Sequence, residues 1–396
     1  MKKNILLAAI AMGSMAMGLT SCSKDDDNSA NKEYYEVIEI ESLDYTSTYQ
    51  KSWNNYMKQV TTLLYNDSEE LYDSWTRPYN ATGYTFAEIF KAHDGNGYES
   101  VEECLDEIID KMAEIANEVG GSKIGGPYDL WTAGNKRQAV LEVESWYSWH
   151  SIDDYTNNIR SVRNVYYGKY FGQNESARIQ NGSMASLMQK YYSLDHQKVD
   201  AAITAAMNAI QSIPAPFRNY IAAPQVITAI DACADLQNVI KNTLKRDMKT
   251  IAENYESDAD KAVAGIVDNV IVPTYQDLYN KNTELQKAVN AFIASPTNAG
   301  FTTLANAWMA SRRPWETSEA FLFGPVDALS LDPNMDSWPL DQDGIERNIK
   351  AGNFDNINWS DGDDDDAIEA AQNLRGFHTL EYLIFKDGKA RTIVSE

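Results

Sequence analysis

Cysteine and histidine are scarce in this sequence, and their scarcity excludes several familiar kinds of site. The chain of 396 residues contains three cysteines and four histidines. Thiolate zinc sites and thioredoxin-type chemistry are excluded because no CxxC pair is present. The sequence also lacks an HExxH motif and a GxSxG elbow, which mark many zinc peptidases and serine hydrolases. Cys104 and Cys233 lie in helix-like segments, where one disulfide and two buried thiols are both compatible with the sequence.

Positive charge is also in short supply. Lysine and arginine total 34 residues against 58 aspartates and glutamates, which gives a formal net charge of −24. Such an acidic protein is a poor partner for nucleic acid or for anionic membrane patches. The excess of carboxylates is compatible with a protein that attracts cations, but it does not identify a cation site.

The N-terminal apolar run, residues 5–17, is short and interrupted by glycine and serine, so it is a poor membrane span. Lys2 and Lys3 precede it, and residues 19–22 (LTSC) resemble a lipobox. Together these features predict a lipoprotein signal peptide over residues 1–22.

Cys22 is then the lipidated residue, and residues 23–32 form a tether to the membrane. Residues 23–27 (SKDDD) resemble the acidic tag of Bacteroidetes lipoproteins that are exported to the cell surface; a plain solvated tether is the alternative. We therefore predict an outer-membrane lipoprotein, facing the periplasm or exposed on the cell, that contacts the membrane only through its lipid anchor.

Apolar residues recur at helical spacing along nearly the whole chain, and alternating strand-like runs are nearly absent. The pattern predicts helices over residues 45–75, 101–119, 136–171, 199–213, 224–255, 261–294, 302–323 and 365–385. Glycine and proline clusters separate these segments. We therefore expect an all-α fold built of helical bundles.

The stretch 376–385 (GFHTLEYLIF) contains an imidazole and a carboxylate three residues apart. His378 and Glu381 would share one face of a helix, so both side chains would reach the same point. Imidazole and carboxylate groups are both good ligands for zinc or iron. Taken alone, the pair is also compatible with a buried polar contact that holds no metal.

A second polar stripe is expected on the segment 302–323, where five residues recur at helical spacing: Trp308, Arg312, Trp315, Glu316 and Glu319. The stripe runs into the apolar residues 320–323, so part of it should be buried. Buried carboxylates need partners, and a cluster with too little positive charge indicates a cation site.

A third polar cluster lies in residues 143–158. The predicted helix places four polar residues on one face, namely Glu144, Ser148, Ser151 and Asn158, with Tyr147, His150 and Asp154 beside it. The tryptophans and tyrosines of this segment are better explained as core packing than as a ligand site.

These segments together resemble the imelysin-like family of bacterial envelope proteins. GFHTLE (residues 376–381) matches its GxHxxE motif, and three other stretches match as well: residues 270–278 (VIVPTYQDL), 308–325 (WMASRRPWETSEAFLFGP) and 336–341 (DSWPLD). In most family members the helix that resembles residues 270–278 opens the chain. Its displaced position here resembles a circular permutation, which bundles tolerate when the original termini lie close together.

The resemblance implies two helical, four-helix-bundle-like domains packed face to face, residues 33–260 and 261–396, with the GxHxxE helix between them. It implies His378, Glu381 and Glu319 as metal ligands. Arg312, Trp315, Glu144 and Ser148 are implied as supporting residues.

Two functions come with the resemblance, iron uptake and metallopeptidase activity. We favour a binding protein for a metal ion or metal chelate, with iron or zinc as the metal and outer-membrane uptake machinery as a partner. His378 has no histidine four residues away and no evident general base beside it, as a zinc peptidase would need. The zinc-dependent peptidase and a non-catalytic surface binder of polysaccharide or protein are the alternatives.

Overall fold

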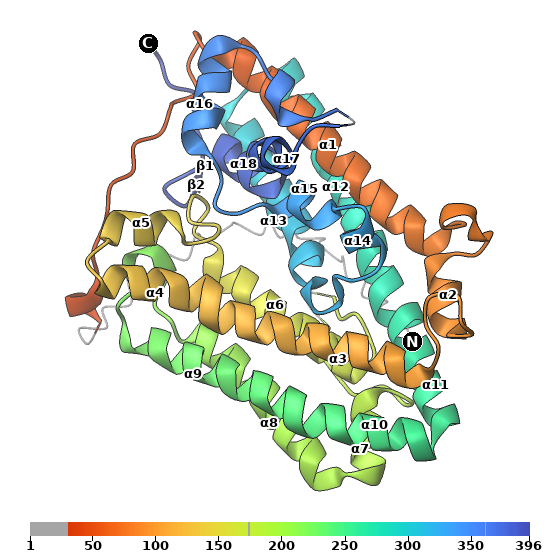
Figure 1. Ribbon diagram of the computed structural model, residues 1–396. Helices are drawn as coiled ribbons and strands as arrows, with labels where there is room; N and C mark the ends of the chain where they lie inside the picture. Colours follow the sequence, from red (N-terminus) through yellow and green to blue (C-terminus); the bar gives the residue numbers. More distant parts are fainter. Residues whose placement is uncertain (1–30, 173–174, 361) are drawn as a thin grey trace, which may run out of the picture. The chain divides into compact units, whose positions relative to one another are not determined.

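Helices make up almost all the regular structure of the computed structural model, which describes residues 31–172, 175–360 and 362–396 (Figure 1). Within those residues the only strands are β1 (Phe385–Lys386) and β2 (Lys389–Ala390), which pair antiparallel. The all-α prediction is confirmed. The signal peptide predicted for residues 1–22, with Cys22, and most of the tether lie outside the described residues.

Most of the longer helices follow the predicted segments closely. The longer helices are α1 (Gln50–Thr76), α3 (Val101–Asn117), α6 (Ser151–Tyr167), α8 (Ser193–Gln211), α9 (Pro224–Val239), α10 (Lys245–Asn254), α11 (Glu256–Ile266), α12 (Val272–Ala294), α13 (Asn298–Glu316), α16 (Gln342–Ala351) and α18 (Gly376–Ile384). Helix α16 is the exception, since it lies in residues 326–363, where no helix was predicted. The shorter ones are α2 (Phe86–Ala92), α4 (Gly125–Thr132), α5 (Lys136–Leu141), α7 (Met184–Tyr191), α14 (Pro325–Ala328), α15 (Leu331–Asp336) and α17 (Asp365–Gln372). Three π-helical turns, η3 (Glu118–Ile124), η5 (Ile240–Leu244) and η6 (Val267–Ile271), continue into α-helices, and η7 (Glu319–Phe321) is a 3₁₀ turn.

Residues 34–396 form one compact unit in which two groups of helices can be followed (Figure 1). In one group α1 packs against α12 and α18, and α12 packs against α13. In the other, α9 packs against α3 and α8, and α6 packs against α8. Helix α13 also contacts α6 and so joins the groups. The division into domains 33–260 and 261–396 stays a prediction, and the packing of α1 does not follow it.

The hydrophobic core explains why these segments are helical. On α1 the buried side chains Trp53, Tyr56, Val60 and Leu64 recur at three and four residues, so they line one face of the helix. Burying such a stripe against neighbouring helices supplies most of the stability of an individual helix. Cys104 and Cys233 are both buried and do not form a disulfide. Of the two possibilities left open by the sequence, the structure therefore shows two buried thiols.

Three predicted helices are interrupted or end early, and these breaks lie at the candidate site. The prediction of one continuous helix over residues 136–171 is wrong, because Ser145 (φ 55°) and Trp149 (φ 65°) adopt left-handed backbone conformations between α5 and α6. Side chains stabilise this turn: the Ser151 hydroxyl donates to the Glu144 carbonyl at 2.6 Å. Glu144 and Ser148 therefore lie in a tight turn rather than on the predicted helix face.

The second interruption separates α17 from α18, where Gly376 has a positive φ of 80°. Asp364 caps the N-terminus of α17 by accepting a hydrogen bond from the Ala367 backbone N–H at 2.9 Å, as expected for the acidic run before it. Glu319 likewise lies in η7, beyond the end of α13, and not on one continuous helical stripe with Arg312.

The C-terminal tail packs along the segment that precedes α1. The Arg391 guanidinium donates to the Leu43 carbonyl at 2.7 Å, and the Val394 backbone N–H donates to the Tyr45 carbonyl at 3.0 Å. Earlier in the chain, the Glu36 backbone N–H donates to the Asn219 carbonyl at 3.0 Å. Circular permutation stays a prediction. Among the described residues, no helix is both long and apolar enough to cross a bilayer.

Candidate metal centre

Gly376 sets the position of the GxHxxE helix. Its φ is positive, and a Cβ atom there would lie 2.3 Å from the Met335 carbonyl oxygen. Only glycine tolerates both the backbone conformation and this close approach. As a result the start of α18 lies against the end of α15, which brings Asp336 next to His378.

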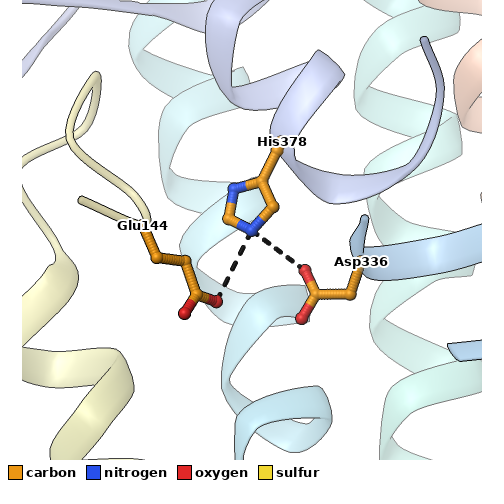
Figure 2. Close-up of side chains that lie close together, drawn as sticks. All are labelled: Glu144, Asp336 and His378. Carbon is orange, nitrogen blue, oxygen red and sulfur yellow. Dashed lines mark ion pairs between the residues drawn. The ribbon is translucent and has the colours of Figure 1, made fainter. Parts of the chain in front are cut away.

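His378 is fully buried and is held from both sides of its ring. Nδ1 lies 3.1 Å from Glu381 Oε2, and Glu381 Oε1 accepts the Ser148 backbone N–H at 2.8 Å. Nε2 points the other way, 3.2 Å from Asp336 Oδ1 and 3.5 Å from Glu144 Oε1 (Figure 2). A histidine whose Nδ1 is fixed by a carboxylate presents Nε2 in one defined direction.

Arg312, fully buried on α13, is the centre of the charge cluster. Its Nη2 lies 2.5 Å from Glu144 Oε1, 2.6 Å from Glu316 Oε1 and 3.3 Å from His378 Nε2. Its Nη1 forms an ion pair with Asp336, and its Nε lies 3.4 Å from Asp154 Oδ2. One guanidinium thus contacts four buried carboxylates.

The pKa shifts show how strongly these charges interact. Burial and the Arg312 guanidinium both lower the pKa of His378, but Asp336 and Glu144 outweigh them and raise it well above its ordinary value. Burial would raise the pKa of Glu144, yet Lys123, His378 and Arg312 together lower it. Burial raises the pKa of Asp154 to about 6, with Arg312 opposing. The carboxylates of the cluster therefore stabilise a positive charge at its centre, whether a guanidinium, a protonated imidazole or a cation supplies it.

An acidic cavity of about 320 Å³ reaches this cluster. Eight carboxylate residues and two lysines line it: Glu114, Glu118, Glu142, Glu144, Glu319, Asp327, Asp332, Asp336, Lys111 and Lys123. Lys123 comes from the π-helical turn η3 and lies 3.1 Å from Glu144 Oε2 and 3.8 Å from Glu319 Oε1. Burial, and then the charge of Asp336, raise the pKa of Asp332 to about 7.

The structure brings most of the predicted site residues together. His378, Glu144 and Arg312 meet directly, Ser148 contributes its backbone N–H, and Trp315 donates from Nε1 to Asp336 Oδ2 at 2.5 Å. Glu319 belongs to a neighbouring group with Glu316 and Asp336, whose carboxylate oxygens lie within 4.8 Å of one another.

Sequence reasoning did not single out Asp336 and Lys123 as site residues. Asp336 opens the DSWPLD stretch, so its place in a matched motif was the available signal. Lys123 lies among glycines in GGSKIGG, which resembles a helix breaker, and no spacing rule connects it with Glu144.

The donor set fits a metal ion. Glu144, Asp336 and His378 each offer one ligand atom, and these atoms lie within 4.8 Å of one another. Four ligands about 2.0–2.2 Å from one ion lie about 3.3–3.6 Å apart in a tetrahedron, close to the two separations measured from His378 Nε2. Carboxylate and imidazole ligands together suit zinc and iron. Arg312 contacts the same carboxylate oxygens, so an incoming ion shares them with a guanidinium.

Comparisons with known proteins agree with the sequence motifs. The family model for imelysin (Peptidase_M75) matches residues 24–243 and 271–395 of this chain. A crystal structure of an imelysin peptidase from Bacteroides ovatus is 46% identical, covers 89% of this chain and 99% of its own, and superposes with a TM-score of 0.84. Iron-regulated protein A of Synechococcus elongatus is 29% identical over 161 residues, which are 40% of this chain and only 36% of that protein.

Proposed function

The chain belongs to the imelysin family, and from this premise we propose that it is a cell-envelope lipoprotein that captures a metal ion, with iron as the cargo. The observation that carries the proposal is the convergence of Glu144 Oε1, Asp336 Oδ1 and His378 Nε2 from three separate segments of the chain. The name of the iron-regulated relative supports iron over zinc. The LTSC stretch at residues 19–22 supports an outer-membrane location.

Each residue of the GxHxxE motif has a distinct part in this proposal. Gly376 allows the close approach of Met335, and His378 supplies the nitrogen ligand through Nε2. Glu381 acts as the orienting group, because both of its oxygens are already engaged by His378 Nδ1 and the Ser148 N–H. Glu144 and Asp336 supply the oxygen ligands.

Arg312 and Lys123 balance the carboxylates while no ion is bound. Buried carboxylates without counter-charges would be very costly, so a protein that releases its cargo needs resident cations. A bound ion is also expected to displace the proton that the raised pKa holds on His378, because a metal binds the neutral imidazole.

The test is metal binding by purified, tag-free protein. After incubation with Fe(II), Zn(II) or a weak Fe(III) chelate and desalting, mass spectrometry should find retained metal, and calorimetry should give its affinity. His378→Gln should lose binding. Glu381→Gln should weaken it by about 10- to 100-fold, as expected for a group that orients a ligand.

His93→Gln is the matched control, since His93 pairs with Asp260 away from the site. It should bind metal like the wild type. Equal metal retention by wild type and His378→Gln would overturn the proposal. Unchanged metal binding together with a large fall in the melting temperature of His378→Gln would identify a purely structural cluster.

A zinc-dependent peptidase is the second candidate, and one observation favours it. Asp332 lines the cavity and has a pKa of about 7, so its carboxylate could accept a proton from water near neutral pH. Casein digestion with added zinc decides between the two. Cleavage that requires zinc and is lost in Asp332→Asn would make the protein an enzyme; metal retention without cleavage supports the binding protein.

A further inference from the structure

Three arginines on α6 and α13 lie outside the metal cluster and have no carboxylate partner among the described residues. Arg160 and Arg163 lie three residues apart on α6, so they share a face of that helix, and Arg313 follows Arg312 on α13. All three are partly buried. Within residues 31–172, 175–360 and 362–396, none of the three forms an ion pair with a carboxylate; Arg160 bonds Asn157, and Arg163 Nη2 lies 3.5 Å from Asn164 Oδ1.

The arginines that are more deeply buried all have acceptors for their guanidinium groups. Arg312 contacts four carboxylates, and Arg375 pairs with Asp67 at 2.6 Å. Arg218 and Arg391 donate to backbone carbonyls. In a chain with 58 acidic and 34 basic residues, three neighbouring arginines without a carboxylate partner are not explained by a shortage of acids.

The three guanidinium groups also repel one another. Burial, followed by the charges of Arg160 and Arg313, lowers the pKa of Arg163 to about 10. Burial and then Arg313 lower the pKa of Arg160. Nε of Arg163 and Nε of Arg313 are buried and lack hydrogen-bond partners. The arrangement of the three arginines therefore combines unsatisfied donors with like-charge repulsion.

Two acids, Asp153 and Asp277, act electrostatically on these arginines but have other surroundings. Asp277 accepts the Tyr170 hydroxyl at 2.6 Å, and Asp153 is largely exposed, 3.6 Å from His150. Both raise the pKa of a neighbouring arginine without pairing with it. Among the described residues, the chain itself therefore supplies no carboxylate partner for these three guanidinium groups.

We propose that Arg160, Arg163 and Arg313 form a binding site for a phosphate dianion, either free or as the terminal phosphate of a lipid. Guanidinium groups match phosphate oxygens in planar, paired hydrogen bonds. A dianion also removes the repulsion among three cations, which a monoanion does only in part. Phe171, with Arg163 and Lys169 at 5.8 and 5.7 Å from its ring centre, borders the site.

Phosphate binding is tested by titrating inorganic phosphate into the purified protein at constant ionic strength, with calorimetry as the readout. The wild type should bind one phosphate, and Arg163→Gln and Arg313→Gln should each weaken binding by about tenfold or more, since charged hydrogen bonds are lost. Arg77→Gln is the matched control, because Arg77 pairs with Asp73 on the surface of α1.

A second measurement separates binding from folding. Phosphate stabilises most proteins weakly by exclusion from their surfaces, so the informative quantity is the difference in melting temperature between wild type and variant. The phosphate-dependent rise should be larger in the wild type than in Arg163→Gln and Arg313→Gln. If both variants lower the melting temperature equally in phosphate and in chloride, or if the wild type binds no phosphate, the arginines are structural and the proposal fails.

Vesicles distinguish the two sources of the phosphate. Co-sedimentation with phosphatidic acid vesicles, lost in Arg163→Gln and absent with phosphatidylcholine, assigns the site to a lipid headgroup. Binding of inorganic phosphate without vesicle binding assigns it to the free ion.

Discussion

Replacing Arg312 by glutamine is the most informative single perturbation of the candidate metal centre. Glutamine keeps much of the length and a donor group but removes the positive charge. Glu144, Asp154, Glu316 and Asp336 would then lose the one side chain that contacts all of them. Lys123 reaches only Glu144 within this set, so it cannot replace the guanidinium.

The expected cost follows from the burial of the cluster. Removing one partner of a buried ion pair typically costs about 3–5 kcal/mol, because the remaining charge is left uncompensated. Protonation of Glu316 limits the fall in the free energy of unfolding, because a protonated carboxyl group no longer carries an uncompensated charge. Burial already raises the pKa of Glu316 well above its ordinary value, which makes this protonation easier. We therefore expect Arg312→Gln to lower the free energy of unfolding by about 3–5 kcal/mol. Folded domains have about 5–15 kcal/mol in total, so the variant should remain folded but marginal.

The metal should reverse much of this loss. With the guanidinium gone, a bound ion becomes the main partner of the same carboxylate oxygens. Saturating metal at 100 times its dissociation constant contributes about 2.7 kcal/mol, which is most of the lower estimate of the loss and about half of the upper one.

Urea denaturation at pH 7, followed by circular dichroism with and without Zn(II) or Fe(II), measures both effects. Arg375→Gln is the matched control: it breaks the buried pair with Asp67 but leaves Arg312 and the proposed ligands in place, so it should be similarly destabilised and gain no more from metal than the wild type does. A loss below about 1 kcal/mol in Arg312→Gln would refute the view that this residue neutralises the cluster. Equal metal-dependent recovery in both variants would refute the link to the metal site.

Three further predictions concern single features of the fold. Gly376→Ala should cost about 1–3 kcal/mol more than Gly83→Ala, measured by urea midpoints, because both positions have φ near 80° but only Gly376 has a backbone oxygen in the way. Burial raises the pKa of Cys104 and Cys233 to about 12, so a thiol reagent at pH 8 should label them only after denaturation; fast labelling of the folded protein would contradict this. Burial lowers the pKa of His196, so the unfolded state binds a proton at this histidine more readily than the folded state does. The free energy of unfolding should therefore fall as the pH drops through about 6.5, and His196→Gln should make that fall smaller between pH 7.5 and 5.5. An identical pH dependence in the wild type and His196→Gln would contradict this prediction.

Helical periodicity was enough to predict the all-α fold and most helix positions, because the apolar faces of these helices are long and regular. On α12 the buried residues Tyr275, Leu278, Leu285, Val289 and Phe292 follow the helical repeat over the whole element. The GxHxxE pair was also predictable, since residues three apart on a helix must share a face. Local spacing thus determined the part of the site that lies on α18.

The rest of the site depends on contacts that no local rule contains. The turn that carries Glu144 and Ser148 requires two residues with positive φ, Ser145 and Trp149, neither of which is a glycine. Tertiary contacts hold this turn, including the hydrogen bond from the Ser148 N–H to Glu381. Lys123 and Asp336 reach the cluster only because η3 and α15 pack against it. Their roles could be found only after the helices were placed.

The geometry also constrains how an ion would enter the proposed site. His378 is fully buried and is not among the residues that line the acidic cavity, whereas Glu144 and Asp336 are. An ion that arrives through the cavity therefore meets carboxylates first and the imidazole last. The first contacts select by charge, because every cation is attracted to the carboxylates that line the cavity. The later contact, with the imidazole of His378, selects by ligand type, because a nitrogen ligand favours zinc and iron over calcium and magnesium, which prefer oxygen. A protein with this order of contacts would tolerate abundant divalent ions such as calcium and magnesium in its cavity and still retain a transition metal at His378.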